Sequence, residues 1–213
     1  MDNVSEEILT AFLNRTEQFH EAAISHIGSI VPAAEQRFIV SFQAGLLSIE
    51  HATGARILIS HGLYASGYSL CRPQYETLVR GIWLLHAAND NWVSKLSEPL
   101  TLESAERAND GVMVAEMLKQ LDASDAPAQL IGQLKQYRDV TWKALNSYAH
   151  GGIHPLARTV RGYPPQLSID VLRNSNALVS IAAQLAAILS GDSRSMQPVR
   201  QMHSEYSDCI PII

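Results

Sequence analysis

Three charged side chains stand four residues apart in an otherwise apolar stretch of the chain, namely Arg72, Glu76 and Arg80. Residues i, i+4 and i+8 lie nearly in line on a helix, so the carboxylate can sit between the two guanidinium groups. Charged side chains on so apolar a helix either form ion pairs or take part in binding or catalysis. The functional interpretation is an anion or nucleotide site, in which arginine binds phosphate and glutamate orients the arginine. The structural alternative, which the sequence alone favours, is a buried ion-pair ladder that fixes helix packing.

A second polar group gathers where a helix predicted over 128–150 should end, and it contains Asn146, Ser147 and His150 before the pair Gly151–Gly152. A histidine there can act as a general base or acid near neutral pH. Ser147 could share a face with His150, but no third orienting group or oxyanion site is evident for a serine nucleophile. The structural alternative is that His150 caps the last carbonyl groups of the helix.

His150 and His154 are four residues apart, as zinc ligands on a helix can be. However, the glycines between them should break the helix, and no His-Glu-x-x-His pattern is present. We therefore expect no metal and no cofactor.

The stretch 153–165 is predicted to be the longest irregular segment, and it carries His154, Arg158 and Arg161. These side chains could be an electrostatic footprint for a phosphate backbone, or they could belong to an ordinary solvated loop. The chain contains no GxxxxGK[ST] or GxGxxG motif, so a classical nucleotide-binding loop is absent.

The elements that must position these residues are helices. Apolar residues recur at intervals of three and four, and no convincing alternating strand or domain linker appears. Pro73 should kink the predicted helix over 65–88 or mark its start. We predict an all-α fold, an up-and-down bundle of about five main helices that forms one domain over residues 1–213.

Composition narrows the class of protein. Of 213 residues, 46% are hydrophobic and 17% charged, which suffices for a proper core. A net charge of -5 argues against a generally basic nucleic-acid binder, although not against a local basic groove. Two cysteines provide neither a disulfide framework nor a metal quartet. The N-terminus lacks the features of a signal peptide, and no apolar run reaches the roughly 18 residues of a membrane span. We expect a cytoplasmic protein without a membrane partner.

The pattern of an Arg-x3-Glu helix followed by a Ser-x-x-His helix end resembles bacterial proteins of the HEPN-like superfamily, in its uncharacterised and abortive-infection branches. The residues that carry the resemblance are Arg72, Glu76, Arg80, Asn146, Ser147, His150, Gly151 and Gly152. The resemblance implies a dimeric helical bundle. Many members are metal-independent ribonucleases of toxin–antitoxin or phage-defence systems, and others are non-catalytic modules that bind nucleotides or protein partners.

Catalytic HEPN-like members carry Arg-x4–6-His, usually with a polar residue after the arginine. The bare spacing occurs here as Arg15 to His20, Arg56 to His61 and Arg80 to His86, without that polar residue. We therefore expect any catalytic site to be a composite one, in which Arg72 and Arg80 bind phosphate, Glu76 orients an arginine and His150 is the acid–base group.

Three roles remain open on the sequence: a ribonuclease or nucleotide-directed toxin, a non-catalytic dimer that binds a nucleotide or protein, and a structural subunit that meets an antitoxin or other regulatory protein. The candidate dimer surfaces are the tail 210–213 and the alanine-rich stretch 182–187. The catalytic hypothesis requires that Arg72 and His150, 78 residues apart, meet where solvent reaches them.

Overall fold

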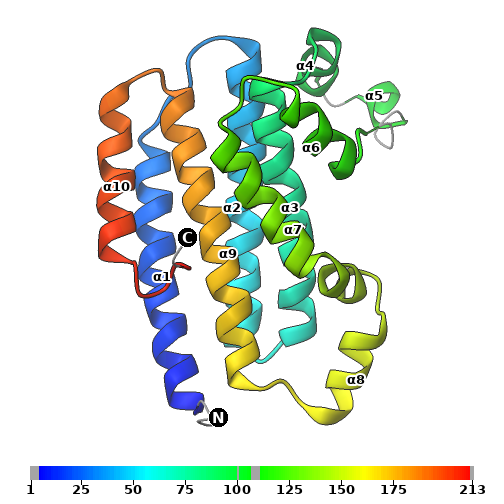
Figure 1. Cartoon of the computed structure of the whole chain (residues 1–213), viewed down its shortest axis with the longest axis vertical. Coiled ribbons are helices and arrows are strands. Elements are labelled where there is room, and N and C mark those ends of the chain that lie inside the picture. The colour runs from blue at the N-terminus through cyan, green and yellow to red at the C-terminus, as the bar shows by residue number, and fades with distance from the viewer. Residues whose placement is uncertain (1–4, 100, 107–110, 212–213) are drawn as a thin grey trace.

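The computed structural model describes residues 5–99, 101–106 and 111–211. Within these ranges the chain forms α-helices and no strand, which confirms the all-α class, and it has ten helices rather than about five. The elements are α1 (Glu6–Gly28), α2 (Gln36–Ser60), α3 (Tyr64–His86), α4 (Asp90–Ser97), α5 (Leu102–Glu106), α6 (Val114–Asp122), α7 (Ala128–Ala149), α8 (Ile153–Arg161), α9 (Pro165–Leu189), a 3-10 turn η1 (Ser193–Ser195) and α10 (Met196–Glu205). The longest helices, with 22 to 25 residues each, are α1, α2, α3, α7 and α9, and the shorter α10 packs beside α1 and α9 (Figure 1).

Helix α3 packs against four other helices, α2, α6, α7 and α9. The turn from α2 into α3 uses Gly62 at φ +75°, a left-handed conformation that glycine adopts without strain. Farther along, a Cβ on Gly67 would lie 2.7 Å from the Ile59 side chain and 3.0 Å from the Ala55 carbonyl oxygen. The absence of a side chain at Gly67 therefore allows α2 and α3 to pack closely.

Pro73 lies well inside α3, which begins nine residues earlier at Tyr64, so the prediction that it could mark the helix start is wrong. The helix continues through Pro73, and the Thr77 hydroxyl donates to the Pro73 carbonyl oxygen at 2.7 Å. The helix thus carries Arg72 and Glu76 on one continuous element.

Helix α9 lies in the core, and most of its side chains are buried. Its small residues face neighbouring helices, and Ala182, Ala183, Ala186 and Ala187 are all almost fully covered within the single chain. Ile210 is buried too. The proposed dimer surfaces at 182–187 and at Ile210 are therefore wrong, because these side chains already fill the core; residues 212–213 lie outside the described ranges.

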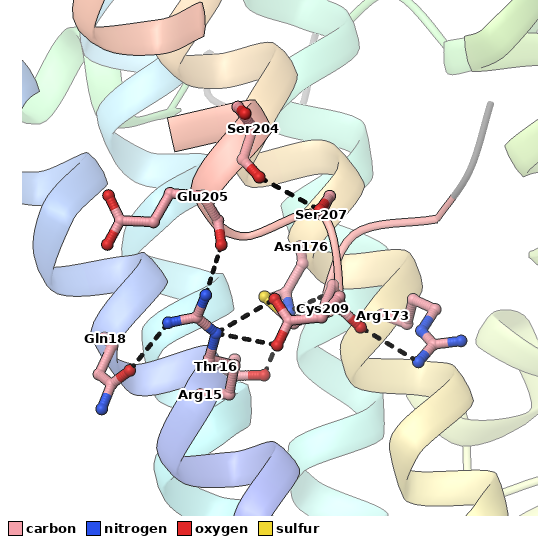
Figure 2. A network of polar contacts seen from close by, with 10 residues as sticks. Arg15, Thr16, Gln18, Arg173, Asn176, Ser204, Glu205, Ser207 and Cys209 are labelled. Atoms are coloured by element: carbon pink, nitrogen blue, oxygen red, sulfur yellow. Dashed lines mark hydrogen bonds and ion pairs between the residues drawn. The ribbon is translucent and has the colours of Figure 1, made fainter. Parts of the chain in front are cut away.

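The C-terminal turn is fastened to α1 by one arginine (Figure 2). The Nε of Arg15 donates to the two carboxylate oxygens of Asp208 at 3.1 and 3.0 Å, and its other nitrogens donate to the Gln18 side chain and the Glu205 carbonyl oxygen. Its guanidinium also lies 4.3 Å from the ring centre of Tyr206. Every partner is a carboxylate, an amide, a carbonyl or a ring, so Arg15 acts as a clasp on the chain end.

Beneath that clasp lies a buried polar cluster of Thr16, His20 and Asn176. The Asn176 amide donates to Thr16 Oγ1 at 3.2 Å and to the Cys209 carbonyl oxygen at 2.9 Å, which leaves its Oδ1 to accept from His20 Nε2 at 3.0 Å. Burial lowers the pKa of His20 to about 4, and nearby Arg56 acts in the same direction. His20 is therefore neutral, and its role is to join α1 to α9.

Residues 153–161 form helix α8, so the prediction that this stretch is irregular is wrong. Pro155 occupies the third position of the helix, where a backbone N–H has no partner within the helix. No helix in the described ranges is long and apolar enough to cross a membrane.

Candidate functional site

The end of α7 meets the middle of α3 at a cluster of Arg72, Glu76 and His150. Arg72 Nε donates to Glu76 Oε1 at 2.8 Å, one helical turn farther along α3. Arg72 Nη1 contacts His150 Nε2 directly, across the gap between the two helices. Two distant stretches of sequence thus place a guanidinium between a carboxylate and an imidazole.

The chemistry of the donor fixes the state of the histidine. A guanidinium group can only donate hydrogen bonds, so His150 Nε2 must accept with its lone pair. The imidazole is then neutral, with its proton on Nδ1. In this arrangement the basic nitrogen of His150 is held by Arg72, and it becomes available only when Arg72 takes another partner.

Solvent reaches the cluster. The side chains of Arg72 and Glu76 are 21% and 30% exposed, and His150 at the helix end is exposed. The structure therefore does not support a sealed ion-pair ladder. It provides a partly covered cationic site, where an anion could compete with His150 for Arg72.

Two further residues of α7, Trp142 and Arg138, complete the site, although their sequence context does not single them out. The Arg72 guanidinium carbon lies 5.2 Å from the Trp142 ring centre, and that of Arg138 lies 5.7 Å from it. Both distances are within the range of cation–π attraction. Arg138, Trp142, Asn146 and His150 are spaced four residues apart at each step, so the sequence indicates that they share one face of α7 but not that this face meets Arg72.

Two polar atoms in this row are buried and make no hydrogen bond within the described chain. They are the Asn146 Oδ1 and the Arg138 Nε. A buried polar atom without a partner costs free energy, so such atoms point to a missing partner such as a water or ligand. An acceptor and a donor are thus left over on α7 beside the cation pair.

Arg80 does not join the cluster. Glu76 pairs with Arg72, and Arg80 forms no ion pair with any residue that the structure describes. The Arg80 Nη2 lies 3.8 Å from where a Cβ on Gly111 would be, which places its guanidinium beside the chain that leads into α6. The expectation of a carboxylate between two guanidinium groups therefore holds for Arg72 alone.

A family model matches residues 45–212, which include α3, α7 and the whole cluster. The chain belongs to DUF6988. This is a family of unknown function. No curated protein and no solved structure matches the chain.

Ser147, in the DUF6988 region, has a structural task. Its Oγ accepts from the His154 backbone N–H at 3.0 Å, and its carbonyl oxygen accepts from the Gly152 N–H at 2.7 Å. These bonds set the start of α8, so the hydroxyl is not directed at His150. Gly151 turns the chain at φ +64°, and α7 ends before it, as the sequence predicts.

The other predicted binding residues lie on α8, outside the cluster. His154 is exposed, and its ring centre is 6.1 Å from that of Tyr148. Arg158 is half-buried beside the same tyrosine: burial raises the pKa of Tyr148, and Arg158 partly opposes that shift. Arg161 is exposed at the end of the helix. These three side chains flank the site rather than form it.

The contiguous Arg-x4–6-His pairs of the sequence do not form sites within the described residues. His20 is buried against Asn176, the His61 ring contacts the Ile57 carbonyl oxygen, and the His86 ring contacts Asp125. Arg15 binds Asp208, and Arg56 pairs with Glu17 at 2.9 Å.

Two cavities of about 590 and 380 Å³ run between α7, α9 and the C-terminal segment, on the side of α7 that Gln133 occupies. They do not include Arg72 or His150. Among the described residues, no group of three or more His, Cys, Asp or Glu side chains is arranged to hold a metal ion.

Proposed function

We propose that the Arg72–Glu76–His150 cluster binds a phosphate group of RNA and cleaves the strand without a metal ion. The observation that carries the proposal is the contact of Arg72 with His150 across two helices, at a position that solvent reaches. Arginine is suited to phosphate, and histidine is suited to proton transfer near neutral pH.

In the proposed reaction, Glu76 holds the Nε of Arg72 and so directs the outer nitrogens toward the ligand. A phosphate oxygen replaces His150 on Arg72, which frees the lone pair of Nε2. That nitrogen takes the proton of the ribose 2′-hydroxyl, and the 2′-oxygen bonds to the adjacent phosphorus. The bond from phosphorus to the 5′-oxygen breaks, and this oxygen receives the proton from the imidazolium. The products are a 2′,3′-cyclic phosphate and a 5′-hydroxyl end.

The guanidinium of Arg138 lies 5.7 Å from the centre of the Trp142 ring and would be a second cation that shares the negative charge developing on the phosphate. The unpaired Asn146 Oδ1 would accept a hydrogen bond from a ligand hydroxyl or amino group. Arg80 has no part in this step, because its guanidinium lies by Gly111.

A second candidate function is binding of a nucleotide or a protein partner without cleavage. It is favoured by the bond that Arg72 donates to His150, because this bond keeps the basic nitrogen occupied. In that case the cluster would respond to a phosphate without transferring a proton.

The wider biological role follows from the resemblance to HEPN-like proteins and is part of the proposal. It includes a homodimer, a toxin–antitoxin or phage-defence system, and an antitoxin or other regulatory partner. The pattern of Arg72, Glu76 and His150 supports it, and gel filtration at several concentrations tests the dimer.

The deciding experiment incubates the protein with structured RNA in the presence and absence of EDTA. We expect cleavage that survives EDTA, leaves 2′,3′-cyclic phosphate ends and is lost in His150→Ala. The matched control is His61→Ala, which removes an exposed histidine from the end of α2. An inert wild-type protein that still binds labelled RNA in an Arg72-dependent way would favour the second candidate, and absence of both activities would refute the assignment of the site to RNA.

A further inference from the structure

Helix α8 presents its apolar residues to solvent. Ile153, Leu156 and Val160 are 76%, 66% and 88% exposed, whereas Pro155 on the opposite side is buried. At 100° per residue the three exposed side chains fall on one face of the helix. A water-soluble surface helix normally has the reverse arrangement, so this outward face calls for a covering partner.

The charge around α8 is as one-sided as its hydrophobicity. Residues 140–169 contain no aspartate or glutamate, although the whole chain has a net charge of -5. The same segment contains Lys143, Arg158 and Arg161. On the helix, Arg161 and His154 border one edge of the apolar face, at about 80° and 100° from Ile153. The partner of this surface must therefore be apolar and negatively charged.

We infer that α8 docks on an anionic lipid surface, with Ile153, Leu156 and Val160 in the interface and the basic side chains against the headgroups. An amphipathic basic helix at an interface has this distribution of side chains. The sequence excluded a membrane partner because nothing in it can span a bilayer, but a helix that lies on the surface needs no span.

The shape of the region favours a lipid surface over a second copy of the chain. In Figure 1 α8 stands beside the end of the bundle, past the end of α7, as a protruding element. A stable protein interface covers about 800 Å² on each partner, which is more than the outer face of a helix of two and a half turns offers. Two copies that met through α8 would also bring like charges together, because the segment holds no acidic residue.

The test is flotation of the full-length protein with vesicles of phosphatidylglycerol mixed with phosphatidylcholine, compared with vesicles of phosphatidylcholine alone, at low salt. We expect the protein to float with the anionic vesicles only. The double variant Leu156→Asp, Val160→Asp should lower the constant for partition of the protein onto the anionic vesicles at least tenfold. Arg161→Gln should lower it about fivefold, since one cation near the surface contributes about that factor.

The matched control is Val31→Asp, which makes the same chemical change at a valine that is 81% exposed between α1 and α2. It should bind vesicles like the wild type, and thermal melting should show that all variants are folded. Failure to float with anionic vesicles, or equal loss in Val31→Asp, would overturn the inference. A dimer in sedimentation velocity that is lost in the double variant, without vesicle binding, would assign the face to a second copy instead.

Discussion

Two arginines of this chain sit in similar surroundings and do different things. Arg15 and Arg72 each hold a carboxylate and each lie near an aromatic ring. The remaining nitrogens of Arg15 donate to the Glu205 carbonyl oxygen and the Gln18 side-chain amide, whereas one nitrogen of Arg72 donates to the imidazole of His150 on another helix. An arginine whose partners are all fixed acceptors stabilises a chain segment. An arginine whose partner is an exposed imidazole on another helix could exchange that partner for an anionic ligand.

Two histidines, His20 and His150, differ in the same way as the two arginines. His20 is buried, donates to Asn176 and has a lowered pKa because burial disfavours its charged form. His150 is exposed and accepts from Arg72. Burial thus keeps the imidazole of His20 as a neutral structural group, whereas the imidazole of His150 is accessible to solvent and ligands.

The largest effect that would test this contrast is on RNA cleavage. Arg72→Ala should lower the cleavage rate by about 100-fold or more, the range seen when a group that stabilises transition-state charge is removed. Arg15→Ala should leave the rate unchanged, because Arg15 holds only the C-terminal turn. Single-turnover assays in EDTA measure both rates. Equal losses in the two variants would mean that Arg72 acts through stability alone.

The next effect is on stability against pH. The folded-state pKa of His20 is about 4, below its unfolded value of about 6.5, so the unfolded chain binds the extra proton between these values. The effect of His20 on the free energy of unfolding is therefore most favourable above pH 6.5. As the pH falls toward 4, the free energy of unfolding decreases by about 3 kcal/mol because the unfolded chain takes up the proton. Urea unfolding of the wild type and of His20→Gln at several pH values measures it. The variant should lose less stability over this range, and parallel pH profiles would show that His20 is not the group responsible.

A smaller effect is expected when the contacts of Arg15 with Asp208 and Glu205 are removed. Arg15→Ala should lower the free energy of unfolding by about 1–2 kcal/mol, a modest value because the Asp208 side chain is 60% exposed and solvent screens the pair. Chemical denaturation measures the change. Asp208→Asn, which keeps an acceptor for Arg15, should lose less than Arg15→Ala, and the reverse order would argue against the clasp.

The smallest effect belongs to the arginine that the structure leaves out of the cluster. Arg80→Ala should change the free energy of unfolding by no more than about 0.5 kcal/mol and should leave the RNA cleavage rate within about twofold. Comparison with Arg72→Ala in the same assay sharpens the distinction between the two arginines of α3. A loss as large as that of Arg72→Ala would return Arg80 to the site.

The sequence predicts much of the fold because helix periodicity and caps are local. It also predicts the Arg72–Glu76 pair, since a spacing of four residues defines a neighbour on a helix. The same spacing predicts that Arg80 also pairs with Glu76, which is wrong because the Arg80 guanidinium lies beside Gly111 instead. Trp142 fits the apolar pattern of α7 equally well as a core residue, so only the packing of α7 on α3 reveals its position over Arg72.

The error at 153–161 has a specific cause. Glycines and a proline suggest an irregular segment, but glycines there end one helix and Pro155 falls in the first turn of the next. The exposed apolar face of α8 also weakens the usual signal, because a short helix without a buried stripe lacks the expected pattern.

The joint between α7 and α8 has a mechanical consequence. A Cβ on Gly152 would lie 2.7 Å from Ser147 Oγ, so the connection between the two helices is closely packed. Ser147 also accepts hydrogen bonds from the backbone N–H groups of Gly152 and His154. Because His150 lies in the chain between Ser147 and Gly152, a tilt of α8 would also shift the exposed imidazole that contacts Arg72.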